Sequence, residues 1–250
     1  MEGKTALEGK TALVTGGARR VGAAIARRLH AAGANVLVHY RGSEAEATLL
    51  VKELNAVRAK SAAGVKADLL APVAPRMLIA AARDAFGRLD VLVNNASAFF
   101  PVKVGEIEST HWEELIGSNL RAPLFISQEA APELAKHEGA IVNIVDIHAE
   151  RPLKGYSVYS VAKAGLACLT RSLALELAPR VRVNGVSPGA IAWPEDGQFE
   201  PGERERIVAT TPLARIGAPE DIAQAVHFLA CAPFVTGQII AVDGGRSIFL

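Results

Sequence analysis

The hydrophobic residues of this chain fall into short, nearly unbroken runs separated by longer segments in which apolar residues recur every three to four positions. The short runs predict β-strands at residues 11–15, 35–40, 61–67, 89–96, 139–147, 181–189 and 238–245. The longer segments predict α-helices at residues 21–32, 44–57, 77–86, 112–134 and 156–177. Strands that do not alternate polar and apolar residues are typical of a parallel sheet covered by helices on both faces.

This alternation predicts an α/β fold: a Rossmann-like, doubly wound parallel sheet of seven strands in a single domain over residues 1–250. Residues 190–202 are irregular and rich in proline and glycine, and we expect the region 190–213 to form a flap over the substrate. The hexapeptide EGKTAL occurs at residues 2–7 and again at 8–13. Because only the second copy runs into a strand, residues 1–8 are expected to be a disordered extension.

The charge is balanced, with 27 basic and 26 acidic residues among 250 and a formal net charge of +1. Such a chain has no long-range field to attract nucleic acid or an anionic membrane surface. No apolar run is long enough to cross a membrane and the start lacks an apolar leader, so the cytoplasm is the expected location. The two cysteines are interpreted as buried free thiols, and the lack of a metal-ligand cluster predicts metal-independent chemistry.

The segment VTGGARRVG, at residues 14–22, joins the first predicted strand to the first helix. Glycine permits a tight turn there, and the free N–H groups at the start of a helix bind phosphate. A glycine turn alone is a weak signal, but this one follows the first strand of an alternating chain. We therefore expect the loop to contact a dinucleotide through Gly16, Arg19, Arg20, Val21 and Gly22.

The end of the second strand distinguishes the two nicotinamide dinucleotides. An NAD enzyme carries a carboxylate there for the ribose 2′-hydroxyl, whereas NADP requires a cation for its 2′-phosphate. The sequence HYRGS places Arg41 at that point and no acid, so NADP(H) is favoured, although Arg41 also suits an exposed strand end. Ser43 is a further donor or a helix cap, and Asp68 reaches the adenine or forms a turn. The residues expected around the adenosine are Tyr40, Arg41, Ser43, Asp68 and Leu69.

Tyr159 and Lys163 are four residues apart and therefore share one face of the helix predicted at residues 156–177. An ammonium close to a phenol favours the phenolate, which would lower the pKa of Tyr159 from about 10 and allow proton transfer at neutral pH. Such a pair is common in sequences and is a weak signal alone. Asn119, inside the helix predicted at residues 112–134, either holds water near the lysine or is an ordinary surface residue.

Five motifs occur in order with suitable spacing: TGGARRVG, NNAS, SNLRAP, YSVAK and RVNGVSPG. Together they resemble the short-chain dehydrogenase/reductase family from residue 10 onward. The resemblance implies a catalytic set that contains Asn119, Tyr159 and Lys163. It also implies cofactor contacts from Asn95, Ala96, Ser97, Tyr159, Lys163, Pro188 and Gly189. The chain departs from the family at Arg20, where a glycine is usual, and at Asp146, where a serine is usual.

Both departures are similar to one branch of that family, the pteridine reductases, which includes dihydropteridine and dihydromonapterin reductases. That branch has a basic pair before the last loop glycine, HY at the end of the second strand, an aromatic residue after NNAS and an aspartate thirteen residues before the tyrosine. The resemblance implies an oxidised pterin, a dihydropterin or dihydrofolate as substrate, contacted by Arg20, Ser97, Phe99, Asp146 and Tyr159. Trp193, in the predicted flap, is expected to cover the ligand or to pin the loop.

An aspartate suits reduction of a pterin better than reduction of a ketone. A ketone oxygen becomes alkoxide-like as hydride arrives, and a carboxylate would repel that charge and raise the pKa of the neighbouring phenol. In a pterin, hydride goes to the carbon of a C=N bond and the nitrogen needs a proton. We expect Asp146 to hold a proton and pass it through Tyr159, Phe99 to stack on the ring and Lys163 to hold the nicotinamide ribose. In the alternative, Asp146 caps a strand and Phe99 only packs.

Two other functions stay open. A reductase of a 3-oxoacyl-thioester, sugar or steroid carbonyl would use the same scaffold, but Asp146 counts against it. A non-catalytic NADP(H)-binding sensor should have lost the tyrosine or the lysine, and both are present. The family resemblance also implies a homotetramer, built on the helices predicted at residues 112–134 and 156–177 and on the C-terminal sequence RSIFL.

Overall fold

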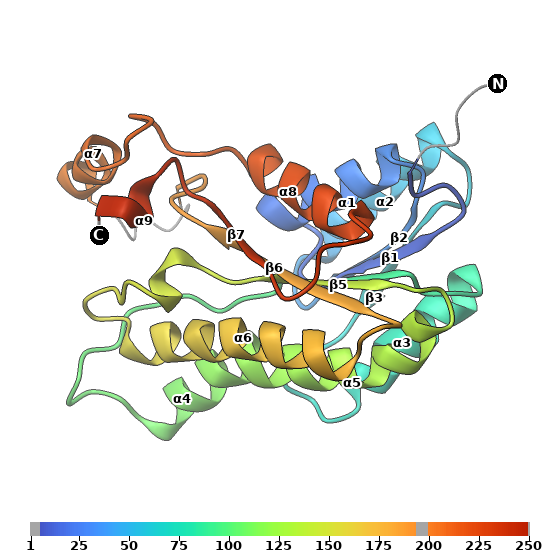
Figure 1. Ribbon diagram of the computed structural model, residues 1–250, viewed down its shortest axis with the longest axis horizontal. Coiled ribbons are helices and arrows are strands. Elements are labelled where there is room, and N and C mark those ends of the chain that lie inside the picture. The colour runs from blue at the N-terminus through green and yellow to red at the C-terminus, as the bar shows by residue number, and fades with distance from the viewer. Residues whose placement is uncertain (1–5, 194–199, 250) are drawn as a thin grey trace.

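The computed structural model describes residues 6–193 and 200–249. Within these residues, seven parallel strands form one sheet in the order β3-β2-β1-β4-β5-β6-β7 (Figure 1). The chain builds the sheet outward from β1 in one direction and then from β4 in the other, and ligands bind sheets of this kind at that reversal. The strands are β1 (Thr11–Val14), β2 (Asn35–Tyr40), β3 (Ala62–Lys66), β4 (Val91–Asn94), β5 (Ala140–Ile144), β6 (Arg182–Pro188) and β7 (Ile239–Val242).

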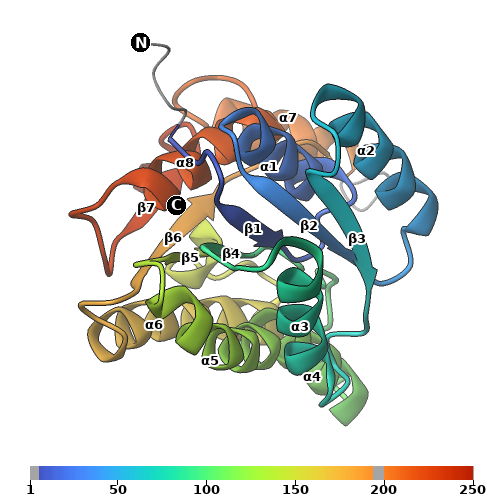
Figure 2. The ribbon, with the colours of Figure 1, turned by 90° about the vertical axis from the view of Figure 1, so that its right-hand side faces the viewer.

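Helices cover both faces of the sheet, as Figure 2 shows. One face carries α1 (Arg20–Ala31), α2 (Glu44–Val57) and α8 (Pro219–Cys231), and the other carries α3 (Ala74–Phe86), α5 (Ala122–Ala135) and α6 (Ser157–Glu176). Helix α4 (Ser109–Ile116) continues the second layer, while α7 (Pro201–Ala209) and α9 (Arg246–Phe249) lie close together at one end of the molecule (Figure 1). The predicted doubly wound α/β fold is therefore confirmed.

Neighbouring residues of a strand enter different hydrophobic clusters, which explains the unbroken apolar runs. On β2, Val36 and Val38 belong to one cluster with Val226 of α8, whereas Leu37 belongs to a second cluster with Leu78 of α3. All five side chains are buried. Burying one such side chain contributes roughly 1.5–3 kcal/mol. The two clusters thus hold the helices on the two faces and leave the polar strand ends to form the site.

The helix predicted at residues 112–134 is interrupted. The segment Gly117–Arg121 forms a π-helical turn between α4 and α5, and Asn119 lies in its middle. Turns of this kind shift the register of a helix locally and are frequent at functional sites. The sequence pattern also leaves out α8, which begins at a proline, a residue that suits the first helical position.

The N-terminal residues and the cysteines differ from expectation. Residues 1–5 of the predicted extension lie outside the described residues. Leu7, however, is fully buried and its N–H donates to the carbonyl oxygen of Ala32 at 3.0 Å, so the extension predicted at residues 1–8 is wrong from residue 6 on. Cys168 is exposed and Cys231 is partly exposed, so the interpretation of two buried thiols is also wrong, although both are free.

Asp90 holds the amino-terminal edge of the sheet. Its Oδ2 accepts a hydrogen bond from the N–H of Thr11 at 2.9 Å, and the Arg88 guanidinium donates to both carboxylate oxygens at 2.8 and 2.6 Å. The Asp90 side chain is only 2% exposed. This buried carboxylate therefore links the start of β1 to the segment that enters β4.

Replacing Asp90 by alanine should lower the free energy of unfolding by about 1–3 kcal/mol, because the buried Thr11 N–H and the partly exposed Arg88 guanidinium lose their acceptor. Urea unfolding followed by circular dichroism measures this change. Asp84→Ala is the control, since Asp84 is exposed on α3, and its effect should stay within about 0.5 kcal/mol. Equal unfolding midpoints for the two variants would contradict this account of the edge.

Candidate active site

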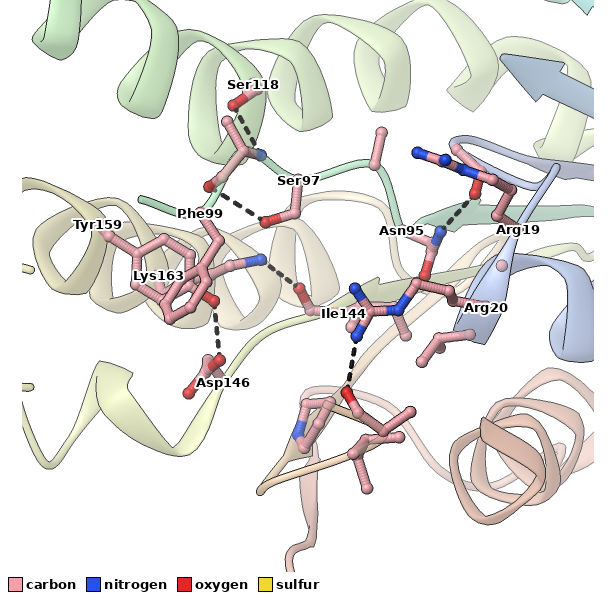
Figure 3. Close-up of a pocket in the computed structure, with 18 of the residues that line it drawn as sticks. Arg19, Arg20, Asn95, Ser97, Phe99, Ser118, Ile144, Asp146, Tyr159 and Lys163 are labelled. Atoms are coloured by element: carbon pink, nitrogen blue, oxygen red, sulfur yellow. Dashed lines mark hydrogen bonds between the residues drawn. The ribbon is translucent and has the colours of Figure 1, made fainter. Parts of the chain in front are cut away.

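A cavity of about 930 Å³ opens at the carboxyl ends of the strands, between the loops that follow β1 to β6 and residues of α7 (Figure 3). Residues far apart in the sequence meet on its wall. Twenty of the residues predicted from the sequence to form the site line this cavity: Gly16, Arg19, Arg20, Val21, Gly22, Tyr40, Arg41, Ser43, Asp68, Leu69, Asn95, Ala96, Ser97, Phe99, Asp146, Tyr159, Lys163, Pro188, Gly189 and Trp193. Asn119 is predicted too but does not reach the cavity wall. The ligand contacts of all these residues stay predictions.

Hydrogen bonds join the loop after β1 to the loop after β4. Thr15 Oγ1 accepts from the N–H groups of Asn95 and Ala96 at 2.9 and 3.1 Å. The side-chain amide of Asn95 donates to the carbonyl oxygens of Thr15 and Gly16 at 2.9 and 3.0 Å. The turn after β1 is thus held in place by the neighbouring strand, at the reversal point of the sheet.

His39 supports the same turn from β2. The Gly16 N–H donates to its Nδ1 at 3.0 Å, and its Nε2 lies 3.1 Å from the carbonyl oxygen of Ala67. These partners require a neutral ring with the hydrogen on Nε2, and burial lowers the pKa of His39 accordingly. The sequence suggests only that His39 ends a strand, because the partner that gives it this role lies on another loop.

Close packing of the loops explains two glycines. Gly16 has a φ of +59°, and a Cβ on it would stand 3.0 Å from the Cα of Ala96. A Cβ on Gly22 would come within 2.1 Å of the carbonyl oxygen of Gly16. Any side chain at either position would push the turn away from the loop after β4 or from the start of α1.

Arg20 connects this turn to the segment after β6. It has a φ of +50°, a conformation that costs a non-glycine residue on the order of 1–2 kcal/mol. Its guanidinium Nη2 donates to the carbonyl oxygen of Ala192 at 2.7 Å, and Ala192 itself has a φ of +44°. One hydrogen bond therefore spans the cavity between two residues in the left-handed conformation, and an anion bound at Arg20 would compete with it.

The end of the cavity near β2 carries both positive and negative side chains. Arg19 and Arg41 are mostly exposed, at 58% and 64%, and each lies near a carboxylate. The Ser43 side chain makes no cap bond to α2, whereas Asp68 Oδ1 accepts from the N–H of Leu70 at 3.0 Å and so shapes a turn. The carboxylates, Glu46 and Glu114, are not suggested by the sequence around the strand end.

Asp146, Tyr159 and Lys163 meet at the other end of the cavity (Figure 3). The Tyr159 hydroxyl donates to Asp146 Oδ2 at 2.7 Å, and the N–H of His148 donates to Asp146 Oδ1 at 2.8 Å. Lys163 Nζ donates to the carbonyl oxygen of Ile144 at 2.9 Å and lies 5.6 Å from the centre of the Tyr159 ring. Tyr159 and Lys163 are 4% and 2% exposed, so both polar tips lie in an environment with little water.

This environment moves two pKa values. Burial, together with the charge and hydrogen bond of Asp146, raises the pKa of Tyr159 well above 10. Burial lowers the pKa of Lys163 to about 8, and the Asp146 carboxylate opposes that decrease. The pKa of Tyr159 is therefore raised and not lowered as predicted, because burial and Asp146 both favour the protonated phenol in the protein alone.

Asn119 is fully buried in the π-helical turn, behind the cavity wall. Its Oδ1 accepts from Ser97 Oγ at 2.6 Å, and its Nδ2 donates to the carbonyl oxygens of Ala98 and Leu115 at 2.8 and 2.9 Å. The amide thus orients Ser97, and these bonds occupy the side chain that was expected to hold water near the lysine. The alternative of an ordinary surface residue is also wrong.

Phe99 lies against two tyrosines at the same end of the cavity. Its ring stacks on Tyr156, with centroids 4.7 Å apart and planes at 16°, and it meets the edge of Tyr159 with centroids 4.8 Å apart. The ring remains partly exposed on the cavity wall. Trp193 also lines the cavity, and the Arg204 guanidinium lies 5.4 Å from its ring centre, which connects the segment after β6 to α7.

Arg246 is a cavity residue that the sequence does not suggest. It is 9% exposed, and its Nη1 donates to the carbonyl oxygen of Ile207 at 2.9 Å and to Thr210 Oγ1 at 3.2 Å. These bonds attach α7 to the C-terminal α9. The motif DGGR gives no sign of this role, because it depends on where the chain returns after β7.

In the described part of the chain, no three side chains of His, Cys, Asp or Glu are grouped so that they could hold a metal ion. None of the helices in residues 6–193 and 200–249 is both long and apolar enough to cross a membrane.

Comparisons with known proteins identify the family of the chain. A family model described as enoyl-(acyl carrier protein) reductase matches residues 16–247. The chain is 41% identical to pteridine reductase 1 of Leishmania tarentolae across 95% of its length and 96% of that protein. It is 37% identical to a 3-oxoacyl-(acyl-carrier-protein) reductase of Staphylococcus aureus, across 94% of the chain and 97% of that protein.

It is also 35% identical to 3beta-hydroxysteroid dehydrogenase 1 of Eggerthella lenta, across 97% of the chain and 95% of that protein. These relatives are named for different substrates, yet the match spans nearly the whole chain in each case. The seven-stranded parallel sheet, the glycine turn after β1 and the Tyr159–Lys163 pair on α6 are features that the sequence predicts. The chain belongs to the short-chain dehydrogenase/reductase family of oxidoreductases.

Proposed function

We propose that this oxidoreductase is an NADPH-dependent pteridine reductase, which transfers hydride to a C=N bond of an oxidised pterin, a dihydropterin or dihydrofolate. The observation that carries the proposal is the 2.7 Å hydrogen bond between Asp146 and Tyr159. The similarity to pteridine reductase 1 of Leishmania tarentolae supports it.

The cavity has the groups that a nicotinamide dinucleotide requires. No side chain caps α1, so the N–H groups of its first turn are available for a diphosphate. Arg19, Arg41 and Ser43 line the end near β2, where a 2′-phosphate would lie, and no carboxylate ends that strand. Lys163 lines the other end of the cavity, beside Tyr159, where the reaction would take place. When bound, NADPH would supply the hydride.

The high pKa of Tyr159 suits the proton transfer that pterin reduction needs. Addition of hydride to the carbon of a C=N bond leaves charge on the nitrogen, which must take a proton. Tyr159 keeps its hydrogen at neutral pH, so it can act as a general acid toward that nitrogen. Tyr159 donates a hydrogen bond to Asp146 at 2.7 Å, and after the transfer the Asp146 carboxylate can take a proton from water in the cavity and pass it to the phenolate.

The remaining walls suit a flat heterocycle with polar edges. Phe99 presents a partly exposed aromatic ring beside Tyr159, on which a pterin can stack. Ser97 and Arg20 supply hydrogen-bond donors, and Trp193 lines the cavity from the segment after β6, where it would cover a bound ligand. A carbonyl substrate would fit this site less well, because the carboxylate of Asp146 would oppose the negative charge that develops on its oxygen.

The function that competes with this proposal is reduction of a carbonyl group. Relatives named for a 3-oxoacyl carrier protein and for a hydroxysteroid match the chain over similar lengths. A cofactor-binding sensor without chemistry is the weaker alternative, because Tyr159 and Lys163 are both in place on α6.

We further propose a cytoplasmic homotetramer. Trp112, Phe125 and Val161, on α4, α5 and α6, are 46%, 45% and 54% exposed, and Ile248 near the C-terminus is 81% exposed. Apolar side chains at such positions are suited to contacts between subunits. Light scattering on the purified protein would give the number of subunits.

The purified protein should oxidise NADPH with dihydrobiopterin or dihydromonapterin and be much slower with an acetoacetyl-thioester. Asp146→Asn keeps the shape of the side chain but cannot hold or pass a carboxyl proton. We expect kcat for the pterin to fall by about 100-fold or more, with little change in KM. The loss of NADPH absorbance measures both substrates.

Asp146→Ser is the complementary variant, because it introduces the serine that is usual at this position in the family. Pterin turnover should fall, and any thioester turnover should rise. Turnover of the thioester alone by the unaltered protein would exclude the pteridine reductase proposal. Circular dichroism confirms that the variants are folded.

The pH profile should show the titration of Lys163. Its pKa is lowered to about 8, so the ammonium that supports Tyr159 is lost above that pH, and kcat/KM should fall about tenfold per pH unit there. Tyr159 cannot cause this decrease, since its pKa is raised well above 10. In Lys163→Arg the cation persists at high pH, so whatever activity remains should show no decrease near pH 8. A wild-type profile that is flat through this range would contradict the assignment.

A further inference from the structure

Two carboxylates lie beside the arginines at the end of the cavity near β2. Arg19 Nη1 is 3.7 Å from Glu46 Oε1, and Arg41 Nη2 is 4.0 Å from Glu114 Oε1. All four side chains line the cavity. The arginines come from the loops after β1 and β2, whereas Glu46 comes from the first turn of α2 and Glu114 from α4. The fold therefore brings acids to a place where the sequence of the strand end has none.

These ion pairs are easily opened. The side chains of Glu46 and Glu114 are 45% and 43% exposed, and those of Arg19 and Arg41 are more exposed still. Exposed pairs at such distances contribute little to stability, because water and salt screen them. A bound anion can therefore replace Glu46 and Glu114 as the ion-pair partner of Arg19 and Arg41. The carboxylates would then stand next to that anion and repel it.

The same carboxylates favour the cofactor that lacks a phosphate. A carboxylate near the adenosine ribose is the group that accepts a hydrogen bond from a 2′-hydroxyl in NAD-dependent enzymes. The end of the cavity near β2 thus contains arginines that suit NADPH together with acids that suit NADH. The selectivity between NADPH and NADH is therefore the difference between the attraction of the arginines and the repulsion of the acids for the 2′-phosphate.

We propose that Glu46 and Glu114 are specificity-determining residues that limit the preference of this protein for NADPH over NADH. They compete with the 2′-phosphate for Arg19 and Arg41 and add a repulsion that NADH does not experience. The inference rests on the proposed function, because it takes this end of the cavity as the 2′-phosphate site. It predicts that the unaltered protein binds both cofactors, with NADPH preferred only moderately.

The chain offers a matched control for each acid. Glu44 lies on the same first turn of α2 as Glu46, but it pairs with Lys66 at 3.0 Å and does not line the cavity. Glu113 precedes Glu114 on α4, is exposed and does not line the cavity either. Each control removes the same charge from the same helix, so any difference reports position and not net charge.

The experiment measures the dissociation constants of NADPH and NADH by fluorescence titration, without any pterin, for the unaltered protein and four variants. In Glu46→Gln and Glu114→Gln, the NADPH affinity should rise about three- to tenfold and the NADH affinity should stay equal or fall. Glu44→Gln and Glu113→Gln should change the ratio of the two constants by less than about twofold. The effect should shrink in about 0.5 M salt, since exposed charges are then screened.

The outcomes separate this inference from the proposed function. If Glu46→Gln and Glu114→Gln change the ratio of the NADPH and NADH dissociation constants no more than their controls do, the inference is wrong. NADPH-dependent pterin reduction can still hold in that case. If the unaltered protein binds NADH more tightly than NADPH, the proposed cofactor is wrong. An exclusively NADPH-binding protein whose ratio does not move in either variant would also overturn the inference. Because the titrations contain no pterin, the measured cofactor affinities do not depend on whether the substrate is a pterin.

Discussion

The active site depends on a cation kept inside the protein. Lys163 is 2% exposed, and its ammonium donates to the carbonyl oxygen of Ile144 above the ring of Tyr159. Removing an ammonium from water is costly, and burial accordingly lowers its pKa to about 8. The Asp146 carboxylate opposes this decrease. A neutral serine in its place would provide no such charge, so Asp146 helps Lys163 stay protonated at neutral pH while it raises the pKa of Tyr159.

Asp146 thus raises the proton affinity of both Tyr159 and Lys163, which suits protonation of the nitrogen of a reduced C=N bond. A phenol with a raised pKa is a poor base but retains its hydrogen until a strongly basic atom appears beside it. The nitrogen of a reduced C=N bond is such an atom. For the oxidation of an alcohol, in contrast, the phenol would have to accept a proton as phenolate, and Asp146 opposes that form. Environments that separate the proton affinities of neighbouring groups are how active sites assign acid and base roles.

The sequence predicts most of the site because parallel strands deliver their carboxyl ends to one edge. Residues that follow the strands, such as Arg41, Asn95 and Asp146, therefore reach the cavity whatever the details of packing. What it does not predict depends on contacts between distant segments. The π-helical turn that buries Asn119, the bond from His39 to the glycine turn and the acid Glu46 near Arg19 all arise only when loops and helices meet. Burial of Leu7 likewise requires the turn around Ala32.

Arginine side chains also hold the two parts of the cavity that the sheet cannot position. Arg20 bonds the segment after β6 through the carbonyl of Ala192, and Arg246 bonds α7 through the carbonyl of Ile207. Arg246 is buried, so its bond is shielded from water, whereas the bond of Arg20 is exposed and links two left-handed residues. The Arg20 bond is therefore the weaker of the two. Arg20 is the first residue of α1, where a diphosphate would bind. The negative charge of a bound diphosphate would therefore compete with the Ala192 carbonyl for the Arg20 guanidinium and weaken the bond that holds the segment after β6.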